Sequence, residues 1–122
     1  MQTLKEAMTT RAVHCYKGRT ALHVILEALD IGAGDEVIVP GFTCVAVPLP
    51  ILSLGATPVY ADIRAQDYNA DPAKLEPLIT PRTRAIVAQH TFGIPAEMDR
   101  LLETARRHGL HLIEDCCHTL TS

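Results

Sequence analysis

The residues at 17–20 (Lys-Gly-Arg-Thr) stand just before an apolar helical repeat, and their types favour the binding of a charged group. A glycine and a hydroxyl residue at a helix start leave backbone N–H groups pointing outward, with the positive end of the helix dipole behind them. Such a position binds anions, most often phosphate. Ordinary capping with Thr20 as the N-cap explains the same residues, so the local pattern leaves both interpretations open.

Asp115 is a second candidate functional residue, because it ends an apolar run that is typical of a buried strand. A carboxylate at the mouth of a parallel sheet stays ionised when it pairs with a cation or a protonated ring nitrogen. An N-cap of a following helix, or a simple surface acid, is an equally good interpretation. His118 lies one helical turn further on if a helix begins there, and it either orients Asp115, stacks on a ligand or has a purely structural role.

The positions of the cysteines favour a packing role over a metal-binding or catalytic role. Cys44 lies just beyond a strand that ends near Pro40, where small residues usually pack. A metal site is not expected, because the one close group, 116–118 (Cys-Cys-His), consists of consecutive residues that rarely surround one tetrahedral ion. All four cysteines are expected to be reduced, as is typical of a cytoplasmic protein; they are Cys15, Cys44, Cys116 and Cys117.

Length and composition exclude several classes of protein. The chain has 122 residues, of which 48% are hydrophobic and 20% charged, so one globular domain is expected and disorder is not. The formal net charge is −3 and no long basic run occurs, which argues against nucleic-acid binding. The longest apolar stretch, 45–56, is too short and too interrupted to cross a membrane. The first residues have no apolar signal region, so a cytoplasmic location is expected.

Helical and strand patterns alternate along the chain. Strands are predicted at 36–39, 57–63, 85–88 and 110–113, with the last one ending at Glu114 and Asp115. Helices are predicted at 20–29, at 43–54, after the N-cap Asp71, and from Pro95 to His108. This alternation predicts a parallel α/β sheet with right-handed crossovers, in which ligands bind at the carboxyl ends of the strands.

Several blocks together resemble one family. The segment Gly18-Arg-Thr-Ala-Leu-His23 resembles the phosphate-binding turn of the DegT/DnrJ/EryC1/StrS family of sugar aminotransferases. The blocks that follow in the family's order and spacing are Gly34-Asp-Glu-Val-Ile-Val-Pro40, Phe42-Thr43, Val45-Ala46, Gly55-Ala-Thr-Pro-Val-Tyr-Ala-Asp62, Tyr68-Asn-Ala-Asp71, Thr80-Pro-Arg-Thr-Arg-Ala-Ile86, Gly93-Ile-Pro-Ala-Glu-Met-Asp99 and Ile113-Glu-Asp115. The resemblance runs from about Tyr16 to His118, which is nearly the whole chain.

The resemblance implies a fold, a cofactor and a reaction. Members of this family use pyridoxal 5′-phosphate (PLP) to move an amino group, usually from glutamate, to a keto-sugar nucleotide, and they work as homodimers. Their fold is the three-layer α/β/α large domain of fold-type I PLP-dependent transferases, with a mostly parallel sheet and a smaller C-terminal domain. By this resemblance, residues 1–122 are a single partial domain, the N-terminal half of the large domain, and the small domain is absent.

The resemblance also assigns roles to particular residues. After Gly18, the backbone of Arg19 and Thr20 would hold the cofactor phosphate, and Asp115 would pair with the protonated pyridine nitrogen. His118 matches a position near the ring that is usually glutamine. Cys44 matches one that is usually an aromatic residue stacked on the ring. Arg19 also departs from the family, because it replaces the common threonine of a Gly-Thr pair.

The Schiff-base lysine of the family has no counterpart here, so no catalytic residue is assigned. Lys5, Lys17 and Lys74 all lie outside the matching position, and transamination by this chain alone is expected to be negligible. An incomplete sheet is also expected to leave one edge and one face open. The first interpretation is therefore a truncated aminotransferase homologue. The alternative is a non-catalytic interaction fragment that pairs with a full-length paralogue; an unrelated small α/β binding domain fits the ordered blocks less well.

The missing lysine yields a direct prediction. When the chain is incubated with PLP and reduced with borohydride, peptide mapping should reveal no lysine that is modified stoichiometrically. Low, scattered labelling of exposed lysines is expected, because amines react with the aldehyde without a defined site. Complete labelling of a single lysine would contradict the assignment.

Overall fold

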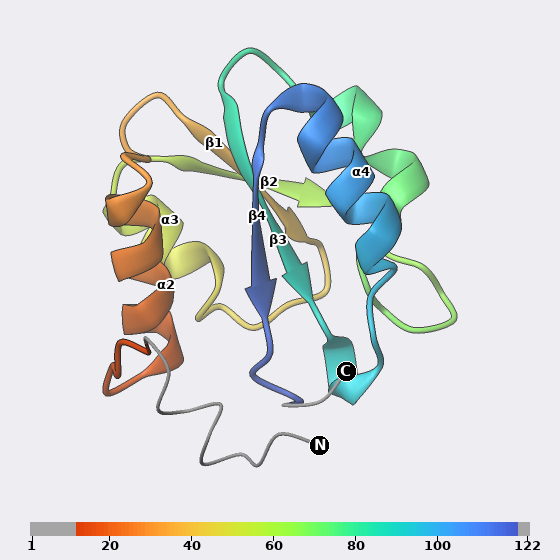
Figure 1. Cartoon of the computed structure of the whole chain (residues 1–122), viewed down its shortest axis with the longest axis horizontal. Helices are drawn as coiled ribbons and strands as arrows, with labels where there is room; N and C mark the ends of the chain where they lie inside the picture. Colours follow the sequence, from red (N-terminus) through yellow and green to blue (C-terminus); the bar gives the residue numbers. More distant parts are fainter. Residues whose placement is uncertain (1–11, 120–122) are drawn as a thin grey trace.

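A parallel sheet with helices on both faces forms the protein in a computed structural model, which describes residues 12–119 (Figure 1). The strands are β1 (Glu36–Pro40), β2 (Thr57–Ala61), β3 (Thr83–Gln89) and β4 (His111–Asp115). The helices are α2 (Gly18–Ala28), α3 (Pro48–Ser53) and α4 (Met98–His108), with 3-10 turns η1 (Pro72–Lys74), η2 (Glu76–Leu78) and η3 (Thr91–Gly93). The predicted α/β class and parallel sheet are confirmed. Within residues 12–119, no helix is long and apolar enough to cross a bilayer.

The strands lie in the order β2-β1-β3-β4, and every neighbouring pair is parallel. The two central strands, β1 and β3, are almost entirely buried. Their sequences, EVIVP and TRAIVAQ, carry β-branched residues on both faces, as expected for strands that are covered from both sides. Because all four strands run the same way, their carboxyl ends meet at one edge of the sheet.

Helices cover each face of the sheet and form two hydrophobic cores. On one face, α2 and α3 bury Leu26 and Ile51 against β1 and β3. The other face is covered by α4 and the segment of η1 and η2 (Figure 1). These elements bury Leu101 and Leu75 against the same strands. The expectation of an uncovered face is therefore wrong. In the described part of the chain, β2 and β4 are the edges, each paired with one strand.

Prolines explain why the predicted helix at 43–54 is shorter in the structure. Only α3 is helical, and it begins at Pro48 with Pro50 close behind. Proline lacks the N–H that an inner helical turn donates, so prolines fit only the first turn and the helix starts there. The residues before Pro48 form turns that carry the chain across the carboxyl edge of the sheet.

Other helix boundaries also differ from the prediction. The helix predicted from Pro95 begins at Met98 and ends as predicted at His108, with Gly109 in the left-handed conformation. Asp71 is the predicted N-cap and accepts the Ala73 N–H at 3.0 Å, but 3-10 turns follow it in place of an α-helix.

A buried acid fixes the opposite, amino-terminal edge of the sheet. Glu36 is 6% exposed, and its carboxylate accepts the Thr80 hydroxyl at 2.6 Å and the Arg82 guanidinium at 2.5 Å. The Thr80 hydrogen bond, with support from Arg82, lowers the pKa of Glu36 below its usual value of 4.5. The carboxylate therefore ties the start of β1 to the loop before β3 more strongly when it is ionised than when it is protonated.

This lowered pKa makes the free energy of unfolding depend on pH in the acidic range. Because the pKa of Glu36 is lower in the folded state than in the unfolded state, its ionisation stabilises the fold at pH values above the unfolded pKa. This stabilisation is lost as the pH falls from about 4.5 through the folded pKa. Glu36→Gln should unfold at lower urea than wild type at pH 7, and the difference should shrink below pH 4.5. Glu103→Gln, at a site 74% exposed, is the control. A difference that persists unchanged to pH 3 would contradict the assignment.

Candidate functional site

A pocket of about 330 Å³ lies between the start of α2 and the carboxyl end of β4. It therefore brings together Gly18, Arg19 and Asp115, which are almost a hundred positions apart in the sequence. Its full lining is Gly18, Arg19, Ala21, Leu22, Ile25, Ala46, Val47, Ile113, Glu114, Asp115, Cys116 and Cys117. Ile25 of α2 lines this opening and is 42% exposed.

The α2 end of the pocket offers backbone donors. The helix starts at Gly18, and its N-cap is Lys17, whose side chain makes no capping hydrogen bond. Thr20 is therefore inside the helix, and its interpretation as the N-cap is wrong. The Thr20 N–H donates to Lys17 O at 3.0 Å, whereas the N–H groups of Gly18 and Arg19 have no partner among residues 12–119. Free amides at the positive end of α2 suit an anion.

The β4 end of the pocket carries Asp115, which is half-buried. Its Oδ1 accepts the Cys117 N–H at 3.0 Å, so the carboxylate is held by a turn of its own chain. No helix follows it within the described residues, which removes the interpretation of Asp115 as a helix N-cap. The hydrogen bond with Asp115, together with burial, raises the pKa of the Cys117 thiol to about 11.

The residues around this pocket fit PLP by the chemistry of their donors. Amides at one end suit a phosphate, a carboxylate at the other end suits a protonated ring nitrogen, and apolar side chains between them suit an aromatic ring. Gly18 lies close to the turn after β4, because a Cβ there would be in van der Waals contact with Cys117 Sγ, 3.4 Å away. Gly18, Arg19 and Asp115 are the residues that would hold the cofactor.

Three other predicted site residues lie beside this pocket and do not line it. Thr20 lines a neighbouring hollow of about 320 Å³, between α2 and α3. Cys44 is exposed in the turns that precede α3. His118 lies in an aromatic cluster, where its ring stacks on Phe92 with centroids 6.1 Å apart and its Nδ1 accepts the Phe92 N–H at 3.0 Å.

The aromatic cluster of Phe42, Tyr68, Phe92 and His118 is the feature that sequence reasoning missed. The rings of Phe42, Tyr68 and Phe92 lie 5.2 to 6.0 Å apart, and each is between 43% and 65% exposed. Tyr68 and Phe92 have φ values of 61° and 55°, which cost about 1–3 kcal/mol each in non-glycine residues. No sequence signal marks these conformations, because glycine or asparagine is the usual residue there.

A buried polar network holds these strained turns. The amide side chain of Asn69, 1% exposed, accepts the Thr91 N–H at 2.8 Å and donates to Ile94 O at 3.0 Å. The Thr91 hydroxyl contacts Tyr68 O at 3.4 Å and accepts from the Gln89 amide at 3.2 Å. These bonds join the segments on either side of β3 and keep the aromatic rings in place.

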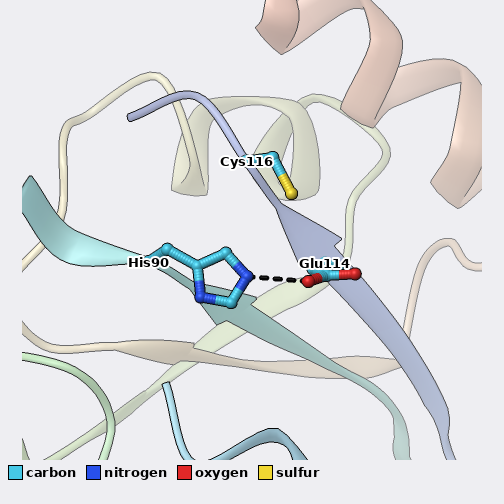
Figure 2. A group of neighbouring side chains, drawn as sticks. All are labelled: His90, Glu114 and Cys116. Atoms are coloured by element: carbon cyan, nitrogen blue, oxygen red, sulfur yellow. Dashed lines mark hydrogen bonds and ion pairs between the residues drawn. The ribbon is translucent and has the colours of Figure 1, made fainter. Parts of the chain in front are cut away.

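His90, Glu114 and Cys116 form a second group at this edge, shown in Figure 2. Their possible ligand atoms lie within 4.8 Å of one another, which resembles a metal site. However, His90 Nδ1 accepts the Ala96 N–H at 3.1 Å, so the proton of the neutral ring is on Nε2, which donates to Glu114 Oε1 at 2.7 Å. If Nε2 bound a metal, the proton of the neutral ring would be on Nδ1. It would then face the Ala96 N–H, and two donors would oppose each other. The geometry therefore indicates a structural hydrogen bond.

The contact between Asp115 and Cys117 is open to a chemical test. In a Cys116→Ser background, alkylation of Cys117 by iodoacetamide should follow a pKa of about 11. Asp115→Asn removes the negative charge beside the thiol, so the profile should move toward the ordinary value of about 9. Asp62→Asn, which changes an exposed acid elsewhere, is the control. An unchanged profile in Asp115→Asn would show that the two side chains do not interact.

Known structures and curated proteins resemble the chain over most of its length. It superposes on *Streptomyces venezuelae* DesV in complex with a ketimine intermediate with a TM-score of 0.81 and 47% identity, covering 84% of this chain and 28% of that one. It superposes on NtdA from *Bacillus subtilis* with bound cofactor PMP with a TM-score of 0.82 and 37% identity, covering 84% and 24%.

The sequence comparisons agree with these structures. The chain is 50% identical over 109 residues to GDP-perosamine synthase of *Caulobacter vibrioides*, covering 89% of this chain and 29% of the relative. It is 50% identical over 101 residues to L-glutamine:scyllo-inosose aminotransferase of *Streptomyces griseus*, covering 83% and 24%. The chain thus spans less than a third of the length of these relatives. A family model matches residues 5–122, and the chain therefore belongs to the DegT/DnrJ/EryC1/StrS aminotransferase family.

Proposed function

We propose that this chain supplies the phosphate end and the pyridine end of a PLP site in an aminotransferase. The complete enzyme would transfer an amino group from an amino acid to a keto-sugar nucleotide, and it would act as a homodimer. The family resemblance implies glutamate as the amino donor. The observation that carries the proposal is the pocket that places free helix N–H groups opposite a carboxylate. The names of the relatives support the substrate class, because they include enzymes of GDP-, UDP- and dTDP-linked sugars.

PLP, when bound, supplies an electron sink that assists proton loss from the carbon bearing the amino group. The chain's own residues contribute orientation and charge. The amides of Gly18 and Arg19 bind the phosphate at the start of α2. The Asp115 carboxylate, held in place by the Cys117 N–H, keeps a proton on the ring nitrogen. The apolar walls, which include Leu22 and Val47, would shield a bound ring from water.

A lysine is the group that this pocket lacks. Lys17 and Lys74 lie in the described part of the chain, and neither lines the pocket. Lys5 lies outside the described residues. We therefore expect this chain to position the cofactor and a lysine from outside residues 12–119 to complete the chemistry.

Restoring the lysine gives the decisive experiment. Residues 1–122 are fused to the C-terminal part of a homologous aminotransferase that carries the lysine, and amino transfer is measured in a single turnover. Asp115→Asn should lower the rate by about a hundredfold or more, because a charge that acts mainly in the transition state is lost. Some cofactor binding should remain, since the phosphate end is unchanged.

Asp62→Asn is the matched control in the same fusion. Asp62 follows β2 closely, is exposed and pairs with Lys74 far from the pocket. Its substitution should leave the rate close to that of the unmodified fusion. Equal loss in both variants, or normal turnover by Asp115→Asn, would contradict the assignment of Asp115.

A further inference from the structure

Arg19 is the one cationic side chain among the residues that line the pocket. It is exposed at the second position of α2, and its guanidinium forms no ion pair or hydrogen bond with residues 12–119. It also lines the neighbouring hollow on the other side of the α2 start. The side chain is therefore available to a ligand at the anion-binding end of the pocket.

The backbone at the start of α2 supplies only part of the positive charge that could hold a phosphate. Asp115 lines the opposite wall and carries a full negative charge when ionised, whereas the carboxylate of Glu114 is bonded to the His90 ring. The start of α2 offers only about half a positive charge from the helix dipole. A phosphate is a multiply charged anion, so the guanidinium of Arg19 would add the full positive charge that the backbone amides do not supply.

We propose that the guanidinium of Arg19 binds the phosphate group directly and makes this pocket selective for phosphorylated pyridoxal derivatives. This inference rests on the proposed function and adds a role for the side chain to the role of the backbone. A guanidinium can donate two parallel hydrogen bonds to phosphate oxygens, which a hydroxyl cannot do. Arg19 thereby offers a charged donor at the position where the family resemblance expects a threonine hydroxyl.

Binding measurements test the role of Arg19 without relying on catalysis. The probes are pyridoxamine 5′-phosphate and pyridoxamine, because neither can form an imine with a lysine, and titration calorimetry of the full chain measures both affinities. Arg19→Gln should weaken pyridoxamine 5′-phosphate binding by about tenfold to a hundredfold. The affinity for pyridoxamine should stay the same. Arg19→Lys keeps the charge and should show an intermediate loss, because the paired hydrogen bonds are missing.

A matched variant separates a local effect from a change in net charge. Arg106 is exposed on α4, lines neither hollow, and carries the same charge as Arg19. Arg106→Gln should bind pyridoxamine 5′-phosphate like wild type, and only Arg19→Gln should reduce the salt dependence of binding. If Arg19→Gln binds the phosphorylated probe as tightly as wild type, the role of Arg19 is refuted and the proposed site stands. If wild type binds neither probe, the cofactor site itself is refuted, and the inference falls with it.

Discussion

The register of β4 against β3 is the constraint on which the site depends. Ala88 pairs with Glu114 and Gln89 pairs with Asp115. Successive side chains on a strand point to opposite faces, so Asp115 lies on the α2 side with Ile113, whereas Glu114 lies on the α4 side with Leu112. A slip of one residue would exchange the two acids and would turn Ile113 out of its core. The pairing of the strands therefore decides which carboxylate enters the pocket.

His90 contributes to this register from the end of β3. Its ring is buried, with Nδ1 fixed by the Ala96 N–H and Nε2 donating to Glu114. The bond selects Glu114 for the α4 face and leaves Asp115 for the α2 face. Its backbone N–H also contacts Asp115 O at 3.4 Å. The hydrogen bond between His90 and Glu114 thus links the ends of β3 and β4, although the residue types resemble a metal site. The position of Asp115 follows from this link.

The strands were predictable from the sequence, and the helix starts were not. Strands β1 and β3 are short β-branched runs bounded by turn residues, and both lie where the pattern placed them. The start of α3 depends on where two prolines fit in a helix. Hydrophobic periodicity contains no information about this, so it does not predict the helix start. The start of α4 shows the same limit, because Pro95 belongs to an irregular segment ahead of the helix.

The site was predictable to the extent that topology alone positions it. The rule that ligands bind at the carboxyl ends of parallel strands selects Asp115, and the family resemblance adds the start of α2. In the structure both line one pocket. The position of His118 was not predictable, because it depends on a ring contact with Phe92, whose φ of 55° has no sequence signal. Tertiary hydrogen bonds stabilise that conformation, and local sequence does not encode them.

Gln89 connects the pocket to the aromatic cluster. Its backbone pairs with Asp115, while its side chain donates to Thr91 and accepts from the Thr43 hydroxyl, beside Cys44. Thr91 in turn is bonded to Asn69 and Tyr68, which hold the strained aromatic turns. Because each of these bonds is buried or half-buried, breaking one would leave an unsatisfied polar group at a cost of about 1–3 kcal/mol. The acid of the pocket and the exposed rings are consequently held by the same strand end.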